Sequence, residues 1–491
     1  MTDKDLYEVV VGLEVHAQLL TQSKLFCGDS IAFGAEPNTH VSPVTLGHPG
    51  TLPKMNRGAI EFTVKMGLAC HCEIEKDNYF ARKNYFYPDL PKGYQVSQHT
   101  TPVCKGGFVT IKTPEGVRNI RLNRIHMEED AGKSLHDADE KNTCIDFNRA
   151  GTPLIEIVSE PDIRSGEEAF TYLTEIRKLV RYLEICDGNM EEGSLRCDAN
   201  ISVRKKGETA LGTKVEIKNL NSIRNVKRAI EAEAKRLVDI MEQGGTIVQQ
   251  TRGFDTNTGT SFAIRDKEDA DDYRYFPEPD LSPFHLQDEF IERIRRSIPE
   301  LPEEKMKRYV SALQISEYDA SVITEEKTFA DYFETVISFL PSPRSGEGQG
   351  MRKACANWML GPVKAWLNEN SKDISDFPLS PEKLAEVIEM TNAGKISFTT
   401  ASGKLFTHLL QHPGKNAASA VKELNLLQES DLSAILLLVD AVIQKFADKV
   451  VGYKKGKKGL LAFFAGEVMK RSKGKADPKI VNELLLDKLK S

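Results

Sequence analysis

A strict two-residue alternation in the stretch Leu195–Arg204 constrains the fold of this chain more than any other feature. Apolar residues at the odd positions alternate with Arg196, Asp198 and other polar residues at the even positions. This is the period of a β-strand whose two faces meet different surroundings. One face should therefore lie on a core while the other carries charge. A shorter copy, Lys214–Lys218, places Glu216 between two lysines.

Two further segments place a lone carboxylate in an otherwise apolar strand. In Val9–Leu20 the side chains of Glu14 and His16 project from the same face, about 7 Å apart. The segment 152–159 is β-branched and apolar except for Glu156. A buried carboxylate without a partner is costly, so this side chain must be paired.

The stretch Asn123–Lys133 ends with three consecutive carboxylates and a Gly-Lys turn. Alternation divides it into two faces, with Ile125, Met127 and Glu129 on one and His126, Glu128 and Asp130 on the other. Carboxylates on a rigid strand suit a hard cation such as Mg²⁺, although a solvated acidic strand end is the alternative. Five strands with such carboxylates and basic residues favour one shared cleft, which is what magnesium–nucleotide chemistry needs.

The chain has 491 residues, which predicts two to three domains. Strand patterns dominate the first part, and helical patterns begin near Pro299. We expect an α+β protein with a mixed β-sheet cradle and flanking helices over residues 1–295. All-α domains should follow over residues 296–414 and 415–491.

Composition points to an ordinary globular protein, with 40% hydrophobic and 28% charged residues. No run approaches the roughly 20 apolar residues of a membrane span, so no membrane is expected as a partner. The charged start of the chain does not resemble a signal peptide, and the eight cysteines are scattered. These features predict a cytoplasmic protein.

The net charge of -6 is distributed unevenly along the chain. Residues 451–491 contain 11 Lys and Arg against 4 Asp and Glu, whereas the rest of the chain contains 55 basic and 68 acidic residues. Two basic clusters flank the apolar run Leu460–Val468, which predicts a helix with Leu461, Phe464 and Val468 on its packed face. The clusters suit nucleic-acid phosphates, and a solvated lysine face is the alternative. They consist of Lys454, Lys455, Lys457, Lys458, Lys470, Arg471, Lys473 and Lys475.

Two proline-bounded loops, Phe80–Gln98 and Asp271–Asp280, combine basic and aromatic residues. Such a mixture suits phosphates and unstacked nucleotides, and loops that merely cover a core are the alternative. The sequence has no P-loop, no Gly-x-Gly-x-x-Gly and no Gly-x-Ser-x-Gly motif, which disfavours hydrolysis by a protein nucleophile. The scattered Cys and His residues do not form a four-ligand zinc pattern.

Several long motifs, in order along essentially the whole chain, resemble one family, the B subunits of the bacterial aspartyl/glutamyl-tRNA amidotransferases. They are Val11-Gly-Leu-Glu-Val-His16, Phe33–Asn38, Arg82-Lys-Asn-Tyr-Phe-Tyr-Pro-Asp89, His126-Met-Glu-Glu-Asp-Ala-Gly-Lys133, Gly151–Arg164, Met190–Ile201 and Asp271–Asp280. Members of the family that carry zinc would have cysteines at Asp29, Ser42 and Thr45. The departure at these positions disfavours zinc.

The resemblance implies a ligase with glutamine as amido donor. ATP would phosphorylate the side-chain carboxylate of misacylated Glu-tRNA or Asp-tRNA, and ammonia would then displace the phosphate. It also implies a heterotrimer with a glutaminase A subunit and a small C subunit, with the basic tail binding tRNA. A non-catalytic tRNA-binding scaffold and a metal-dependent phosphohydrolase are the competing classes.

The same resemblance implies roles for particular residues. The magnesium-bearing catalytic pocket would consist of Glu14, His16, Glu129, Glu156 and Asp198. We expect Glu129 rather than Glu128 from the facing of Ile125 and Met127. Contacts to ATP or the tRNA acceptor end would come from Arg82, Lys83, Arg196, Lys214, Glu216 and Arg274.

Overall fold

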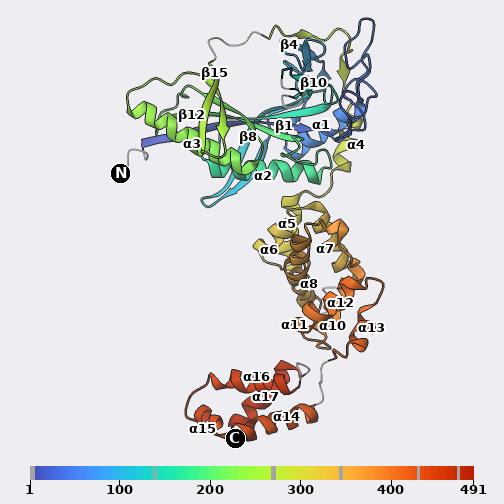
Figure 1. Cartoon of the computed structure of the whole chain (residues 1–491), viewed down its shortest axis with the longest axis vertical. Coiled ribbons are helices and arrows are strands. Elements are labelled where there is room, and N and C mark those ends of the chain that lie inside the picture. Colours follow the sequence, from blue (N-terminus) through green and yellow to red (C-terminus); the bar gives the residue numbers. More distant parts are fainter. Residues whose placement is uncertain are drawn as a thin grey trace. The chain divides into compact units, whose positions relative to one another are not determined.

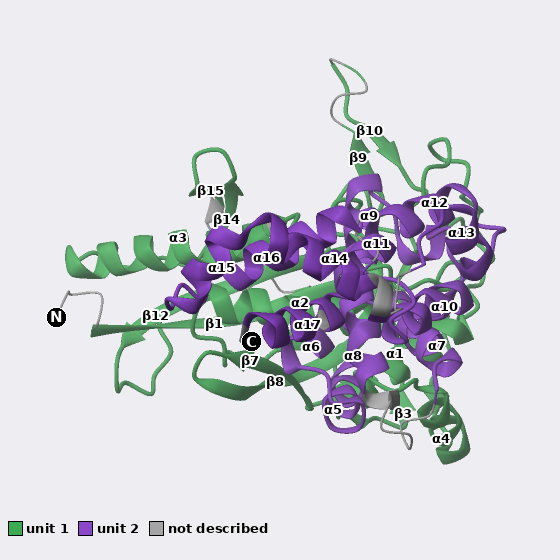
Figure 2. Ribbon diagram, turned by 90° about the horizontal axis from the view of Figure 1, so that it is seen from below, with its two compact units in different colours: residues 1–301 green, residues 302–491 purple. Residues whose placement is uncertain are grey.

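The computed structural model of the chain describes residues 6–135, 139, 141–266, 273–341, 347–427, 432–472 and 476–490. The chain forms two compact units, Met1–Leu301 and Pro302–Ser491 (Figure 2). Strands lie in the first unit, and the second is helical, so the predicted α+β class is confirmed (Figure 1).

A mixed sheet forms the centre of the first unit. Its strand order is β15-β14-β13-β12-β1-β11-β8-β6-β2, with β7 paired to β8, and only the β13–β14 pair is parallel among the described strands of this sheet. The strands are β1 (Tyr7–Gln18), β2 (Glu73–Ile74), β6 (Cys104–Lys105), β7 (Phe108–Thr113), β8 (Gly116–Glu129), β11 (Pro153–Ser159), β12 (Leu195–Lys205), β13 (Val215–Leu220), β14 (Gln250–Asp255) and β15 (Thr260–Asp266).

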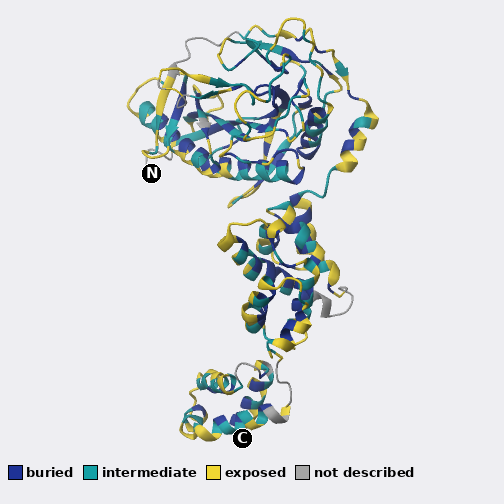
Figure 3. Ribbon diagram, turned by 45° about the vertical axis from the view of Figure 1, so that its right-hand side comes forward, coloured by how far each residue is buried: buried dark blue, intermediate teal, exposed yellow. Residues whose placement is uncertain are grey.

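Helices cover one face of this sheet, because the odd-numbered residues from Val11 to Ala17 and from Leu195 to Val203 are apolar and buried there. The helices are α1 (Arg57–Ala69), α2 (Gly166–Tyr182), α3 (Ile223–Glu242) and α4 (Asp288–Ser297) (Figure 1). Helix α2 begins after the N-cap Ser165, whose side chain accepts a hydrogen bond from the Glu168 N–H. The burial predicted for one face of β12 is confirmed. Figure 3 shows buried residues gathered in the interior of the first unit and exposed residues in its outer loops.

A small three-stranded sheet of order β16-β4-β5 lies beside β8. Its strands are β4 (Ala81–Asn84), β5 (Tyr94–Ser97) and β16 (Phe276–Pro277). Two short pairs complete the unit, β9 (Lys133–Leu135) with β10 (Cys144–Asp146) and β3 (Asp77–Asn78) with β17 (Phe284–His285). The small sheet brings the aromatic and basic loop segments to the polar face of the central sheet, as the hydrogen bonds from Ser97 and Gln95 to Glu128 demonstrate.

The second unit contains two separate hydrophobic cores, one within residues 306–421 and one within residues 435–489. The first core includes buried Ala417, Ala420 and Val421, which lie after the predicted boundary at residue 414. The larger helices around the first core are α5 (Pro302–Leu313), α6 (Glu317–Ile323), α7 (Lys327–Phe339), α8 (Glu347–Trp358), α9 (Lys364–Asn370), α10 (Pro381–Asn392), α12 (Phe406–Gln411) and α13 (Ala417–Glu423). Those of the second are α14 (Leu432–Lys445), α15 (Ala447–Lys454), α16 (Leu460–Arg471) and α17 (Pro478–Lys490).

Within the described residues, none of the helices is both long and apolar enough to cross a membrane.

Candidate catalytic cleft

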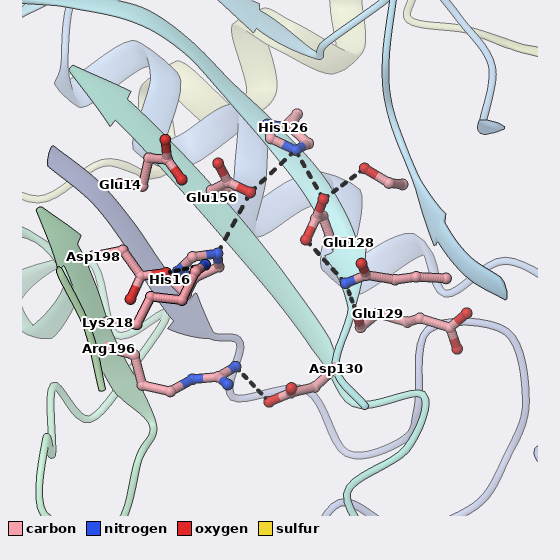
Figure 4. A network of polar contacts seen from close by, with 12 residues as sticks. Glu14, His16, His126, Glu128, Glu129, Asp130, Glu156, Arg196, Asp198 and Lys218 are labelled. Carbon is pink, nitrogen blue, oxygen red and sulfur yellow. Dashed lines mark hydrogen bonds and ion pairs between the residues drawn. The ribbon is translucent and has the colours of Figure 1, made fainter. Parts of the chain in front are cut away.

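Strand register brings the charged residues into rows across the polar face of the central sheet. His16 on β1 lies opposite Glu156 on β11, which lies opposite His126 on β8. Two residues before His16 on β1, Glu14 lies opposite Asp198 on β12. Because side chains two residues apart project to the same side, these rows form one polar surface (Figure 4).

The first group of potential metal ligands consists of His16, Glu128 and Glu156, whose ligand atoms all lie within 4.8 Å of one another. The Nε2 atom of His16 is 3.4 Å from Oε2 of Glu156. The neighbouring His126 places its Nε2 3.1 Å from Oε1 of Glu128 and 3.6 Å from Oε2 of Glu156. Burial alone would lower the pKa of His16, but the hydrogen bond and charge of Glu156 raise it.

The second group consists of Glu14, Asp198 and Glu216, again with ligand atoms within 4.8 Å of one another. Burial, together with the negative charges of Glu156 and Glu216, raises the pKa of Glu14. The Lys218 ammonium partly neutralises the group, since its Nζ lies 3.0 Å from a carboxylate oxygen of Asp198 and 3.0 Å from one of Glu216. The second group therefore contains three carboxylates beside the single ammonium of Lys218.

Lys83 supplies the cation for the first group. Burial would lower its pKa, but the negative charges of Glu128 and Glu156 raise it, so the amine stays protonated. Its Nζ lies 5.1 Å from the centroid of the Tyr273 ring. A half-buried ammonium therefore lies near the carboxylates, as expected for a site that handles phosphate.

Glu129 does not lie in this cleft, contrary to its predicted position. Its Oε2 accepts a hydrogen bond of 2.6 Å from Lys92, and its Oε1 accepts one of 2.8 Å from the Val96 N–H. The physical reason is the alternation itself. Ile125 and Met127 turn toward the apolar core, and Glu129 shares their side of β8, whereas Glu128 shares the side of His126.

Arg82 is turned away from the carboxylate groups because it neighbours Lys83 on β4. Its guanidinium donates two hydrogen bonds, of 2.7 and 2.8 Å, to Glu278 and lies 4.1 Å from the Tyr94 ring centroid. This predicted contact for ATP or tRNA is therefore occupied by a bidentate ion pair that ties β4 to the segment after β16. Its neighbour Lys83, by contrast, lies near the charges of Glu128 and Glu156.

The other predicted contacts are distributed around the cleft. Arg196 lies opposite His16 on β12 and donates a hydrogen bond of 2.8 Å to Asp130. Lys214 is exposed and lines a cavity that Glu14 also lines. Glu216 belongs to the second carboxylate group, and Arg274 is exposed, with its carbonyl accepting a hydrogen bond of 2.8 Å from the Asn84 side chain.

Sequence reasoning gave no role to His126 or Lys218. Both were visible as polar residues on strands, but only strand pairing shows that they contact the carboxylate groups. The signal that could have identified them is their position two residues from Glu128 and Glu216, on the same strand faces.

Cys27, Asp29, Ser42 and Thr45 form a hydrogen-bonded cluster. The Asp29 Oδ2 atom accepts from the Thr45 hydroxyl at 2.5 Å, from the Ser42 N–H at 2.8 Å and from the Cys27 thiol at 3.3 Å. These bonds hold the pKa of Asp29 below its ordinary value despite the opposing effect of burial. The single thiol and the hydroxyl donors do not form the Cys/His set that zinc prefers.

The helix predicted between the basic clusters of the tail is confirmed as α16. Phe464 and Val468 are fully buried, and Leu461 packs partly buried against the same core. The described basic residues at its two ends are Lys454, Lys455, Lys457, Lys458, Lys470 and Arg471. Lys473 and Lys475 lie outside the described residues.

Comparison with known proteins agrees with this architecture. The family described as the GatB/GatE catalytic domain matches residues 9–292, and the GatB domain family matches residues 331–489. Similar curated proteins are the B subunits of aspartyl/glutamyl-tRNA(Asn/Gln) amidotransferases. That of Thermodesulfovibrio yellowstonii is 49% identical over 99% of both chains, and that of Geotalea daltonii is 49% identical over 98% of this chain and 99% of its own. The chain therefore belongs to the family of aspartyl/glutamyl-tRNA(Asn/Gln) amidotransferase B subunits.

Proposed function

We propose that this chain catalyses the ATP-dependent step of a tRNA amidotransferase. A side-chain carboxylate oxygen of Glu or Asp on a misacylated tRNA attacks the γ-phosphorus of ATP, and ADP leaves. Ammonia then attacks the carbonyl carbon of the acyl phosphate, and phosphate leaves as the amide forms. The products are Gln-tRNA(Gln) or Asn-tRNA(Asn), and the enzyme is a carbon–nitrogen ligase. The relatives' names describe this class of activity.

The observation that carries this proposal is the gathering of two carboxylate groups, Lys83 and Lys218 on one face of the sheet. Joining a carboxylate to a phosphate brings two anions together, so the chemistry needs positive charge more than a protein nucleophile. Lys83 would stabilise negative charge beside Glu128 and Glu156. Lys218 would do the same beside Asp198 and Glu216.

The donor sets fit magnesium, since they are mainly carboxylate oxygens on strands that hold them within reach of one another. His16, Glu128 and Glu156 would hold one ion, and Glu14, Asp198 and Glu216 would hold another. Bound magnesium would neutralise phosphate charge and orient the phosphates for in-line transfer. His126, hydrogen-bonded to Glu128, would fix the orientation of that carboxylate.

Ammonia must come from a partner, because no glutaminase motif was found in the sequence. We propose that this chain works in a heterotrimer with a glutaminase A subunit and a small C subunit, and that the complex is cytoplasmic. The second unit would bind the tRNA through its basic clusters.

The test of this function is ATP consumption by the assembled complex. Hydrolysis of ATP should increase at least tenfold when misacylated Glu-tRNA(Gln) or Asp-tRNA(Asn) is added, and correctly acylated tRNA should have no effect. A scaffold would consume no ATP, and a phosphohydrolase would consume ATP equally without tRNA. Either result would refute the proposal.

We also propose that the Asp29 cluster holds its loops without zinc. Metal analysis of the purified complex should find less than about 0.1 zinc per chain, and a chelator should leave the melting temperature unchanged. Replacing Asp29 with Ala should lower stability by about 1–3 kcal/mol near pH 7, because three donors lose their acceptor. The folded-state pKa of Asp29 is depressed, so this contribution is present above the unfolded pKa near 4 and is lost as the pH falls through the folded value.

Urea unfolding of wild type and Asp29→Ala from pH 7 down to about pH 2, which crosses the unfolded pKa of the carboxyl group, checks this prediction. Stoichiometric zinc, or a stability difference that grows on acidification, would contradict it.

A further inference from the structure

Strand β8 contains a bulge in its pairing with β11. Leu122 pairs with Ser159, and Arg124 pairs with Val158, so two steps along β8 correspond to one step along β11. Asn123 is therefore the extra residue of β8. Bulges of this kind interrupt the hydrogen-bonded ladder, and they are common beside active sites, where they change the direction of a side chain.

The bulge directs Arg124 to the polar face of the central sheet. On its N-terminal side, the even-numbered residues Ile120 and Leu122 are buried in the core. On its C-terminal side, the odd-numbered Ile125 is buried there instead. Without the extra residue, Arg124 would continue the buried row of Ile120 and Leu122. With the extra residue, it shares the face of Glu128 in the first group of potential metal ligands.

The guanidinium of Arg124 has no hydrogen bond and no ion pair among the described residues, and its Nε atom is buried. The two other arginines of β8 are paired, Arg118 with Glu168 and Arg121 with Asp162. An arginine keeps its proton in a protein, so burial does not remove this charge. Partial burial of an unpaired charge is costly, which indicates that Arg124 acquires a partner during function.

The polar face carries the carboxylates of both groups of potential metal ligands, yet Arg124 pairs with none of the described ones. Lys83 and Lys218 supply the positive charge beside those groups. Arg124 is half-buried, and of its three nitrogens only Nε is buried without a partner, so the two terminal nitrogens remain accessible. A guanidinium can donate to two oxygens of one phosphate at once. The arrangement therefore fits a phosphate that comes from outside the chain.

Resting on the function proposed above, we infer that Arg124 is a catalytic residue that binds the phosphate chain of ATP during phosphoryl transfer. A carboxylate oxygen of the substrate attacks the γ-phosphorus, the bond to the β,γ-bridging oxygen breaks, and its electron pair leaves with ADP. Arg124 neutralises the charge that develops on these oxygens, as arginines do in other phosphoryl-transfer sites. His126, which contacts both Glu128 and Glu156, lies two residues away, about 7 Å along the strand, within the reach of an arginine side chain.

The test compares Arg124→Ala and Arg124→Lys with Arg121→Ala in the assembled complex. The kcat/KM for ATP, measured with saturating misacylated tRNA, should fall about 100-fold or more in Arg124→Ala. It should fall about tenfold or more in Arg124→Lys, because an ammonium keeps the charge but does not bind two oxygens in a fork. Arg121→Ala should match wild type, since the Arg121 side chain is 69% exposed and its ion pair with Asp162 contributes little.

Rescue by guanidinium ion separates a catalytic role from a structural one. Guanidinium at tens of millimolar should restore part of the lost activity of Arg124→Ala, and it should not raise the activity of wild type or Arg121→Ala. The KM for misacylated tRNA should stay within about threefold in all variants, because Arg124 is assigned to the nucleotide rather than to the tRNA backbone. Arg124→Lys keeps the charge and nearly the length of the side chain, so it reports even if Arg124→Ala fails to fold.

An unchanged kcat/KM for ATP in both Arg124 variants overturns the inference. A higher KM for tRNA with unchanged constants for ATP also overturns it, because that result would place a tRNA phosphate at Arg124. Loss of activity that guanidinium does not restore would show a structural role and overturns it as well. A wild-type complex that consumes no ATP with misacylated tRNA would refute the proposed function itself, whereas an active wild type with an equally active Arg124→Ala refutes only this inference.

Discussion

Replacing Glu128 with Gln should lower tRNA-dependent ATP consumption by about 100-fold or more in the assembled complex. Glu128 lies in the carboxylate group that would hold magnesium, and His126 and Lys83 both interact with it. Neutralising it removes a hard ligand and the charge that fixes the orientation of its partners. Glu14→Ala and His16→Ala should have the same effect.

The matched control is the adjacent residue, Glu129. Glu129→Gln should mainly reduce stability, by about 3–5 kcal/mol, because it leaves the Lys92 ammonium, whose side chain is only 11% exposed, without its carboxylate partner. Turnover per folded molecule should fall far less than in Glu128→Gln. Glu128→Gln should have a smaller effect on stability, because it also relieves repulsion between two buried carboxylates, Glu128 and Glu156.

Initial rates of ADP release and thermal unfolding of both variants decide between these positions. The assignment would be wrong if Glu129→Gln were fully stable but inactive while Glu128→Gln remained fully active. That result would assign the catalytic role to Glu129.

Ending the chain at Leu427 should raise the KM for misacylated tRNA by about tenfold to 100-fold while leaving turnover at saturating tRNA within about threefold. The removed part contains its own hydrophobic core, including Ile435, Val439 and Phe464, so the remaining chain keeps its two other cores intact. A cut at residue 414 would instead remove α13, which is buried in the preceding core. Backbone phosphate contacts add affinity without altering the reaction itself.

The salt dependence of tRNA binding gives a second readout for the same truncation. Each lost phosphate contact should reduce the slope of log affinity against log salt by roughly 0.7 to 0.9. The control replaces Lys454, Lys455 and Lys457 by Gln within the full chain, since all three side chains are exposed. Its slope should fall between wild type and the truncated chain. Equal affinities and slopes in all three proteins would mean that these lysines form only a solvated face.

The sequence by itself determined the local features of this protein. Alternation in β12 and β1 identified their polar faces, because a strand's side chains project to opposite sides whatever surrounds it. The apolar spacing of Leu461, Phe464 and Val468 identified α16 for a similar reason. Glu14, His16, Glu156 and Asp198 were all predicted to share a cleft, and the structure places them on one surface.

Only the tertiary structure decided which strands are neighbours and which face meets the core. Alternation assigns Glu128 and Glu129 to opposite sides of β8, but it does not say which side meets the cleft. The packing of Ile125 and Met127 settles this in favour of Glu128. The register between β8 and β11 then places His126 beside Glu156. This pairing depends on contacts between residues far apart in the sequence, which no local pattern encodes.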